Sequence, residues 1–158
     1  MTWKSKLINL KPTPMIGDTL SPLNDEEISQ IEKQIGAHFP TDYRWFLLHY
    51  GDCDLDEYTI FTNEACSVVP SYFFGRTVVA MRDEFNNRLP RLMIPINDDG
   101  AQNLICISLR PDSYGVIFFQ NHSASPDSSD DEFDQMKLNT MIKIASSFSQ
   151  FIQELVVL

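Results

Sequence analysis

The sequence has few of the residues that build disulfide frameworks, zinc sites or phosphate-binding loops. Its 158 residues include three cysteines, Cys53, Cys66 and Cys106, and no two of them have the C-x-x-C spacing. An odd number of widely spaced cysteines indicates neither a disulfide scaffold nor a zinc ribbon, so we expect reduced, mostly buried thiols. The six glycines form neither a G-x-G-x-x-G motif nor a Walker loop. The sequence therefore predicts no phosphate-binding cradle.

A long apolar run is also missing. No stretch approaches the roughly 20 apolar residues that cross a bilayer, and the first residues, MTWKSKLINLKPTP, have no apolar signal-peptide core. We expect a cytoplasmic protein that does not insert into a membrane. Hydrophobic residues make up 43% of the chain, which is enough for one ordinary core. This composition predicts a single domain over residues 1–158.

Positive charge is scarce. The chain has 12 Lys and Arg against 22 Asp and Glu, a formal net charge of -10. This balance opposes direct binding to nucleic acid, whose affinity depends on clustered Lys and Arg. An acidic surface suits a basic protein partner, because complementary potentials speed up encounter. Solubility alone is the other explanation of the charge.

Two short helices are predicted near the N-terminus. In LNDEEISQIEKQIG, Asn24 can cap a helix, Glu27 completes a capping box, and Gly36 ends the helix. In FPTDYRWFLLHYG, Pro40 lies near the start of a second helix, and Gly51 is placed to adopt the left-handed conformation after its end. The two segments predict a helical hairpin.

Short β-prone runs follow. YTIFT, CSVVP and SYFFG predict strands, and TVVAMRDEFNNRL predicts a further helix. The next three segments, RLMIPI, QNLICISL and GVIFFQ, predict an antiparallel meander because the turn-like stretches NDDGA and RPDSY separate them.

The last part of the chain predicts a loop and one long helix. NHSASPDSSDDEFD is rich in Ser, Asp and Pro, which predicts a solvated loop with little to bury. In LNTMIKIASSFSQFIQELVVL, apolar residues recur at helical spacing, which predicts one amphipathic helix over the sheet. Its expected apolar face consists of Leu138, Met141, Ile142, Ala145, Phe148, Phe151, Ile152 and Leu155.

The best candidate for a metal site is an incomplete calcium loop. Asp52, Asp54 and Asp56 occupy positions 1, 3 and 5 of that pattern. However, Glu57 stands where the loop needs a glycine, and Asn63 stands where it needs a bidentate glutamate. We therefore expect an acidic surface loop and no metal.

No other cluster predicts catalysis. The stretch Asn97-Asp98-Asp99-Gly100 is typical of a turn, because Asn, Asp and Gly tolerate positive φ and form local hydrogen bonds. The three histidines are scattered and none has a second histidine at metal-ligand spacing. The sequence therefore predicts neither a catalytic residue nor a cofactor.

Three ordered motifs resemble one family. LNDEEISQIEKQIGAHFPTDYRWFLLHYGD resembles the N-terminal signature of the SMI1/KNR4 (SUKH) superfamily, LMIPINDDGAQNLICISLRPDSYGVIFFQNHS is similar to its central hairpin, and IASSFSQFIQEL resembles its closing helix. The matching structural positions are Glu32, Gly36, Pro40, Tyr43, Phe46, Gly51, Pro95, Gly100, Gly115 and Phe148. One departure is Ala101, where family members often have a second glycine, so the turn geometry is expected to differ there.

The resemblance implies an α+β fold in one domain, with a central, mainly antiparallel sheet flanked by an N-terminal helical hairpin and a C-terminal helix. Its core would cover about residues 20–158, and residues 1–19 would be an N-terminal extension. The helix and strand patterns described above predict the same arrangement without the resemblance.

For function, the resemblance implies protein binding without catalysis. Many bacterial members of the family are immunity proteins that neutralise toxins, often nucleases, whereas fungal relatives are regulators. We expect an immunity protein with a basic toxin domain as partner, and the alternative is an adaptor or ligand-sensing regulator. The candidate contact residues are the acids Asp52, Asp54, Asp56, Glu57, Asp98, Asp99, Asp130, Asp131 and Glu132.

Overall fold

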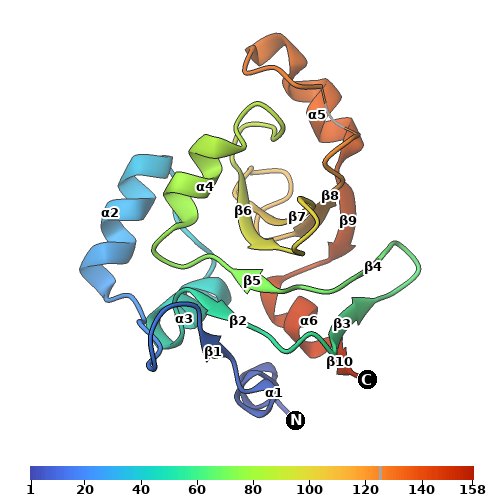
Figure 1. The fold of residues 1–158 in the computed structure, drawn as a ribbon. Coiled ribbons are helices and arrows are strands. Elements are labelled where there is room, and N and C mark those ends of the chain that lie inside the picture. The colour runs from blue at the N-terminus through green and yellow to red at the C-terminus, as the bar shows by residue number, and fades with distance from the viewer. Residues whose placement is uncertain (125) are drawn as a thin grey trace.

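A computed structural model describes residues 1–124 and 126–158, and an antiparallel sheet runs through its centre (Figure 1). The seven strands of this sheet have the order β1-β2-β5-β6-β7-β8-β9. Their bounds are β1 Thr13–Pro14, β2 Cys53–Asp54, β5 Tyr72–Phe73, β6 Met93–Asp98, β7 Leu104–Ser108, β8 Ile117–Gln120 and β9 Ile142–Ala145. A second, three-stranded sheet has the order β10-β3-β4, with β10 Leu155–Val157, β3 Thr59–Thr62 and β4 Ser67–Val68. The α+β prediction is confirmed.

Helices pack on this framework. They are α1 Trp3–Leu10, α2 Asp25–Ile35, α3 Thr41–His49, α4 Val78–Glu84, α5 Asp134–Thr140 and α6 Phe148–Gln153, with a 3-10 turn, η1, at Asp131–Phe133. Helix α4 contacts β6, and α6 contacts α1, α3 and β9. Figure 1 shows α1 close to the end of the chain, whereas α5 stands at the opposite extremity.

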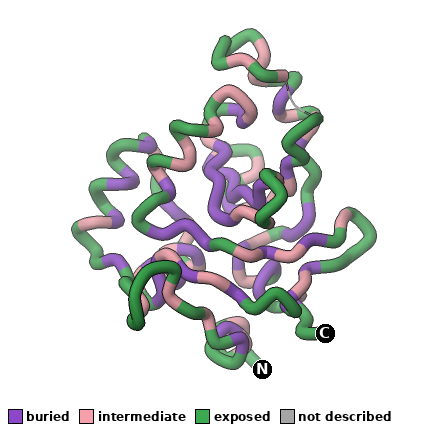
Figure 2. The backbone as a smooth tube through the Cα atoms, in the orientation of Figure 1, coloured by how far each residue is buried: buried purple, intermediate pink, exposed green. Residues whose placement is uncertain are grey.

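Aromatic rings fill the space between the sheet, α3 and α6. The centroid of Phe46 lies 5.1 Å from that of Phe73 on β5 and 5.2 Å from that of Phe148 on α6. Phe151 continues the cluster to Phe61 on β3, with centroids 5.0 Å apart. Because these side chains are fully buried, they supply much of the apolar area removed from water on folding. Figure 2 shows the buried backbone concentrated in β6, β7 and the inward sides of the helices.

The local predictions for the first two-thirds of the chain are confirmed. Asn24 caps α2, accepting from the Glu27 amide at 2.8 Å, and Glu27 completes the capping box. Gly36 ends the helix at φ 83°. Gly51 follows α3 at φ 70°, where an added Cβ would lie 2.3 Å from the Ser21 carbonyl oxygen. The predicted strands after Gly51, the helix before β6 and the β6-β7-β8 meander are all present.

The prediction of one long C-terminal helix is wrong. The chain instead forms the end of α5, then β9, α6 and β10. The β-branched Ile142 pairs with Phe119 of β8, so this segment extends the large sheet. Ser147 then starts α6 by accepting from the Gln150 amide at 3.1 Å. The expected helical face of Leu138, Met141, Ile142, Ala145, Phe148, Phe151, Ile152 and Leu155 is thus divided among four elements, with Met141 in the extended residue between α5 and β9.

Two further segments contain helical structure that the sequence does not predict. The N-terminal extension contains α1, whose Trp3 lies edge-on to Trp45 with ring centroids 5.1 Å apart, and whose Leu7 is fully buried. The predicted solvated loop over residues 121–134 ends in η1 and the first residue of α5, since Asp130 accepts from the Glu132 amide at 3.2 Å. Ser125 of that loop lies outside the described residues.

Candidate functional site

Strand register brings two of the predicted contact acids to one face of the sheet. Asp54 pairs with Tyr72, and Tyr72 pairs in turn with Asp98. Directly paired residues of antiparallel strands project to the same face. The Tyr72 side chain is 43% exposed, and both carboxylates are partly buried. We call Asp54, Tyr72 and Asp98 the sheet row.

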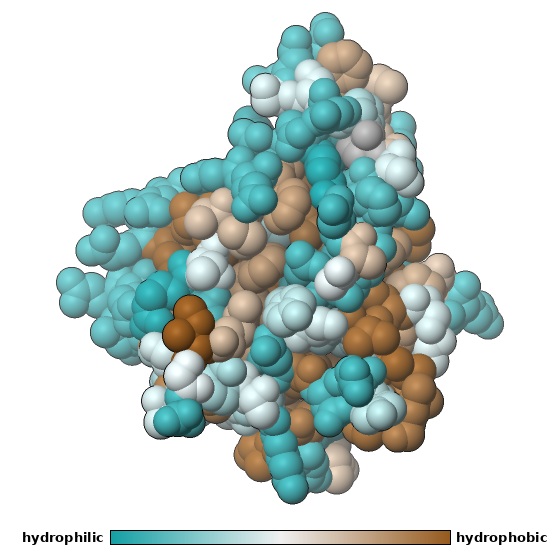
Figure 3. All heavy atoms as spheres, in the orientation of Figure 1, coloured by the Kyte–Doolittle hydropathy of each residue, from teal (hydrophilic) through white to brown (hydrophobic). Residues whose placement is uncertain are grey.

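The sheet row faces away from the aromatic core. Successive residues of a strand point to opposite faces, and Phe73, next to Tyr72, packs against Phe46 and Phe148. Tyr72 therefore lies on the other face. Figure 3 shows hydrophilic and hydrophobic side chains interspersed over the middle of the molecule in this view, with a hydrophobic area toward the C-terminal end.

The two ends of the sheet row have different neighbours. Beyond Asp98, the register continues to Leu104 and Gln120, both fully buried. The Arg88 guanidinium closes this end, because it donates to the Gln102 carbonyl at 2.7 Å and to Gln120 Oε1. At the other end Asp54 pairs with Thr13 of the two-residue strand β1.

Asp54 and Asp98 differ in their hydrogen bonding. Asp98 Oδ1 accepts from the Gly100 amide at 2.6 Å. Asp54 Oδ1 is shielded from solvent and has no hydrogen-bond partner within the described chain. Burial raises the pKa of the Asp54 carboxyl above its ordinary value, because the charged form loses hydration. The Asp54 carboxylate thus has a shielded oxygen that accepts no hydrogen bond from the described part of the folded chain.

The other acids of residues 52–57 lie outside the row. Asp52 accepts from the Gly75 and Arg76 amides, each at 2.8 Å, and from the Thr77 hydroxyl. Asp56 accepts from the Tyr58 amide at 2.8 Å, and Glu57 is exposed. These contacts fix the local backbone. Among the residues that the structure describes, no three His, Cys, Asp or Glu side chains come together as a possible metal site.

The turn after β6 is built by its own carboxylates. Asp99 Oδ1 accepts from the Ala101 amide at 2.7 Å and the Asn103 amide at 3.1 Å. Gly100 takes φ 83°, and the second residue with positive φ is Gln102, at 69°. Ala101 therefore needs no left-handed conformation, which explains how the turn tolerates a non-glycine residue there. The interpretation of this cluster as a hairpin turn is confirmed.

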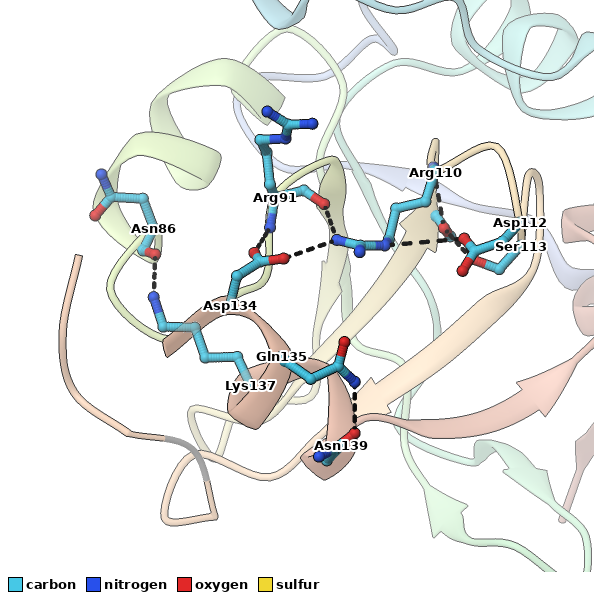
Figure 4. A network of polar contacts seen from close by, with 10 residues as sticks. Asn86, Arg91, Arg110, Asp112, Ser113, Asp134, Gln135, Lys137 and Asn139 are labelled. Atoms are coloured by element: carbon cyan, nitrogen blue, oxygen red, sulfur yellow. Dashed lines mark hydrogen bonds and ion pairs between the residues drawn. The ribbon is translucent and has the colours of Figure 1, made fainter. Parts of the chain in front are cut away.

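A second polar region lies where α5 meets the segment between α4 and β6 (Figure 4). Asp134 accepts from the Arg91 amide at 2.5 Å and from the Arg110 guanidinium at 3.2 Å. Arg110 also donates to the Arg91 carbonyl at 2.8 Å, and the buried Lys137 donates to the Asn86 carbonyl at 3.3 Å. We call Asp134, Arg110 and Lys137 the α5 anchor.

The α5 anchor borders a cleft of about 290 Å³. Arg82, Arg91 and Asp131 are among the side chains that line it, together with Asp134 and Lys137. Of the acids predicted here as contacts, Asp130 is turned to its own backbone, whereas Asp131 and Glu132 are exposed. The cleft thus contains charges of both signs.

The positions matched to the family motifs have structural roles. Glu32 is 6% exposed and accepts from the Phe39 amide and the Arg44 guanidinium, each at 2.7 Å. The Tyr43 hydroxyl donates to the Phe74 carbonyl at 3.1 Å, and burial raises the pKa of this phenol. The others occupy the core, turns or strand β6, namely Gly36, Pro40, Phe46, Gly51, Pro95, Gly100, Gly115 and Phe148.

All three thiols are free, as predicted. Cys53 and Cys106 are fully buried, and Cys66 is partly buried. Burial raises the pKa of the Cys53 and Cys106 thiols far above the ordinary value. Because the thiolate is the reactive form, these two side chains pack as small apolar groups.

Sequence reasoning missed Tyr72 and the α5 anchor. Tyr72 lies in the predicted strand SYFFG, but its exposure and its acidic neighbours depend on segments that are distant in the sequence. For the α5 anchor, the sequence predicts that Asp134 lies in a loop, and no local pattern singles out Lys137. In the part of the chain that the structure covers, no helix is long and apolar enough to cross a membrane.

Comparison with known proteins agrees with the fold. The family model described as SMI1 / KNR4 family (SUKH-1) matches residues 22–154. The SPbeta prophage-derived uncharacterized protein YokK of Bacillus subtilis (strain 168) is 24% identical over 157 residues, which covers 84% of this chain and 74% of that protein. The family match begins after α1 and includes every residue of the sheet row.

Proposed function

The chain belongs to the SMI1/KNR4 (SUKH-1) family, and from this premise we propose that it is an immunity protein that binds a basic toxin domain through the sheet row. Binding masks the toxin surface, and no bond is made or broken. The observation that carries the proposal is an exposed tyrosine placed by strand register between two partly buried carboxylates.

Charge and residue type both support this function. Tyrosine is enriched at the energetic centres of protein interfaces, because a rigid ring buries a large area at little entropic cost. The net charge of -10 would attract a basic partner from a distance and speed its encounter. A nuclease has such a basic surface, because it must hold a phosphate backbone. The prophage origin in the name of the Bacillus subtilis relative is compatible with a role in competition between genetic elements.

The test is capture of the toxin domain encoded beside the gene. We expect the wild-type chain to form a complex and to protect cells that express the toxin. Asp54→Lys and Asp98→Lys should each slow association at least tenfold, because each replaces an attractive charge with a repulsive one. Folded wild-type protein that neither binds the toxin nor protects cells would contradict the proposal.

A matched control is available at Asp112, whose side chain is 73% exposed. This residue follows the Ser108 end of β7, whereas the sheet row meets β7 at its other end, Leu104. Asp112→Lys makes the same change of charge outside the row. If it slows association as much as Asp54→Lys, general electrostatic attraction explains binding and the row has no special part.

The cleft beside the α5 anchor favours a second function, that of an adaptor or ligand-sensing module. Its volume of about 290 Å³ is close to the lower end of the range for small-molecule sites, and its charges of both signs could orient a polar ligand. Asn86→Trp would place a bulky side chain at this cleft. If toxin capture and protection survive that change, the cleft has no part in the immunity function.

A further inference from the structure

We propose that the sheet row is a receptor for one arginine side chain of the partner, whose guanidinium would lie on the Tyr72 ring and reach the carboxylates of Asp54 and Asp98. This inference rests on the proposed function, because it names the chemical group that the same surface recognises on the toxin. It commits to arginine and excludes lysine as the preferred contact.

The spacing of the strands fits a guanidinium. Adjacent strands lie about 4.8 Å apart, so the backbones that carry Asp54 and Asp98 stand roughly 10 Å apart with Tyr72 between them. A guanidinium is flat and has donors on opposite edges, each forming hydrogen bonds of about 2.8 Å to a carboxylate. It can therefore donate to both sides at once. The ammonium of lysine is a compact point charge, which is less suited to bridging two separated carboxylates.

The position of Tyr72 provides a surface for stacking. Its ring reaches toward the β6-β7 turn, since ring atom Cε2 lies 4.0 Å from the position that a Cβ on Gly100 would occupy. This is the turn held by Asp98, so the ring and that carboxylate are close neighbours. Arginine stacks on aromatic faces more often than lysine does. An exposed ring beside free carboxylate oxygens thus favours the planar cation.

The chain leaves the acceptors of this site unfilled. Asp54 Oδ1 is shielded from solvent and has no hydrogen-bond partner in the described residues. An external guanidinium would therefore meet this carboxylate at Oδ2, or at Oδ1 after the side chain rotates, and would compensate a shielded charge that is otherwise unfavourable. Within the described chain, the one hydrogen bond of the Asp98 carboxylate is made by Oδ1. An incoming guanidinium would supply donors to both groups.

Arg88 is a cation of the chain that lies beside the covered end of the sheet row. Its guanidinium donates to Gln102 and Gln120 at the covered end of the row. Its positive charge acts on Asp98, but the residues to which it donates lie on the opposite side of Asp98 from Tyr72 and Asp54. An external arginine would therefore reach the row from the exposed side of Tyr72.

The experiment is an NMR titration of the full chain with three small probes. N-acetyl-arginine amide carries the guanidinium, N-acetyl-lysine amide carries an ammonium, and N-acetyl-citrulline amide has nearly the shape of the arginine probe without its charge. We expect saturable amide shifts around Asp54, Tyr72 and Asp98 with the arginine probe at millimolar concentration. The lysine probe should bind at least fivefold more weakly, and the citrulline probe should cause no comparable shifts.

Matched variants identify the contacts. Asp54→Asn and Tyr72→Leu should each weaken binding of the arginine probe at least fivefold, whereas Asp112→Asn should leave it unchanged. Asparagine keeps the size of the side chain, so a loss of binding reports the charge. Equal binding of arginine and lysine, shifts spread over the whole acidic surface, or unchanged binding in Asp54→Asn would each overturn the inference.

The outcome is separable from that of the proposed function. If the arginine probe fails but the row variants still impair toxin capture, the receptor is wrong and the immunity function stands. If the probe binds as expected but no toxin is captured, the immunity function is wrong and the arginine receptor stands.

Discussion

The sheet row and the α5 anchor use the same kind of side chain in opposite ways. In the α5 anchor, Asp134 is held by the Arg91 amide and the Arg110 guanidinium. In the sheet row, Asp54 has a shielded oxygen without a partner in the described chain. The α5 carboxylate therefore stabilises the fold, whereas the Asp54 carboxylate carries an unsatisfied oxygen that is a cost to the fold. Position and hydrogen bonding separate structural acids from candidate contact acids where composition alone does not.

This contrast has a physical basis. A charged hydrogen bond to a partly buried carboxylate contributes about 1.5 to 3 kcal/mol to stability, and an unsatisfied one costs a similar amount. A surface selected for stability alone would replace Asp54 by a neutral residue. A residue that breaks a local rule without compensation in the fold is a mark of a functional surface.

The largest expected effect breaks the α5 anchor. Asp134→Ala should lower the free energy of unfolding by about 2 kcal/mol, because the Arg91 amide and the Arg110 guanidinium lose an acceptor. Urea denaturation measures the loss, and hydrogen exchange should become faster in residues 131–140. Asp112→Ala is the control, and its exposed ion pair should contribute less than about 0.5 kcal/mol. If both variants lose the same free energy of unfolding, Asp134 contributes no more to the fold than an exposed acid does.

The next effect measures coupling between partners. A double-mutant cycle with Arg110→Met and Asp134→Asn should give a coupling energy of about 1 kcal/mol, because these side chains are in direct contact. The same cycle with Asp54→Asn and Asp98→Asn should give a value within about 0.3 kcal/mol of zero. A large coupling in the second cycle would mean that the row is a structural network like the anchor.

A smaller effect of opposite sign is expected in the sheet row. Asp54→Asn should raise the free energy of unfolding by roughly 0.5 kcal/mol, since it removes a shielded charge without removing a hydrogen bond. Thermal and urea unfolding measure the change. Asp98→Asn, which keeps an oxygen for the Gly100 amide, should be close to neutral. Destabilisation by Asp54→Asn would show that this carboxylate supports the fold.

The smallest expected effect is the pH dependence of the stability difference between Asp54→Asn and the wild type. Burial raises the folded-state pKa of Asp54 above the ordinary value of 3.8, so the folded chain holds this proton more tightly than the unfolded chain. Stability contributed by the protonated form is complete below 3.8 and is lost as the pH rises through the folded-state pKa. The advantage of Asp54→Asn over the wild type should thus exist at pH 7 and vanish near pH 3. Urea unfolding at the two pH values measures this difference in stability. A difference that is the same at pH 7 and pH 3 would contradict the assigned cause.

Local signals in the sequence were sufficient for much of the fold. The capping box of Asn24 and Glu27 and the Asp-rich turn at Gly100 depend on residues a few positions apart, so their geometry could be predicted. The C-terminal error has a different origin. Met141, Ala145 and Phe148 have helical spacing, but Ile142 gains more from pairing with β8 than a helix could provide.

The candidate site could be predicted only in part. Asp54 and Asp98 were recognised as acids of interest, but their position on either side of Tyr72 depends on β5 lying between β2 and β6. That order follows from long-range pairing, which no local pattern encodes. The same limit applies to Asp134, whose partner Arg110 lies in the β7-β8 connection.

The aromatic packing described for α6 also has a consequence for synthesis on the ribosome. Phe148 and Phe151 emerge after every strand of the large sheet, and their rings fill the space beside Phe46, Phe61 and Phe73. A chain that stops before α6 presents an unfilled apolar hollow to the solvent, which is the kind of surface that chaperones bind. Completion of the core is therefore a late event, and a released chain that ends before residue 148 should associate with chaperones for longer than the chain of residues 1–158.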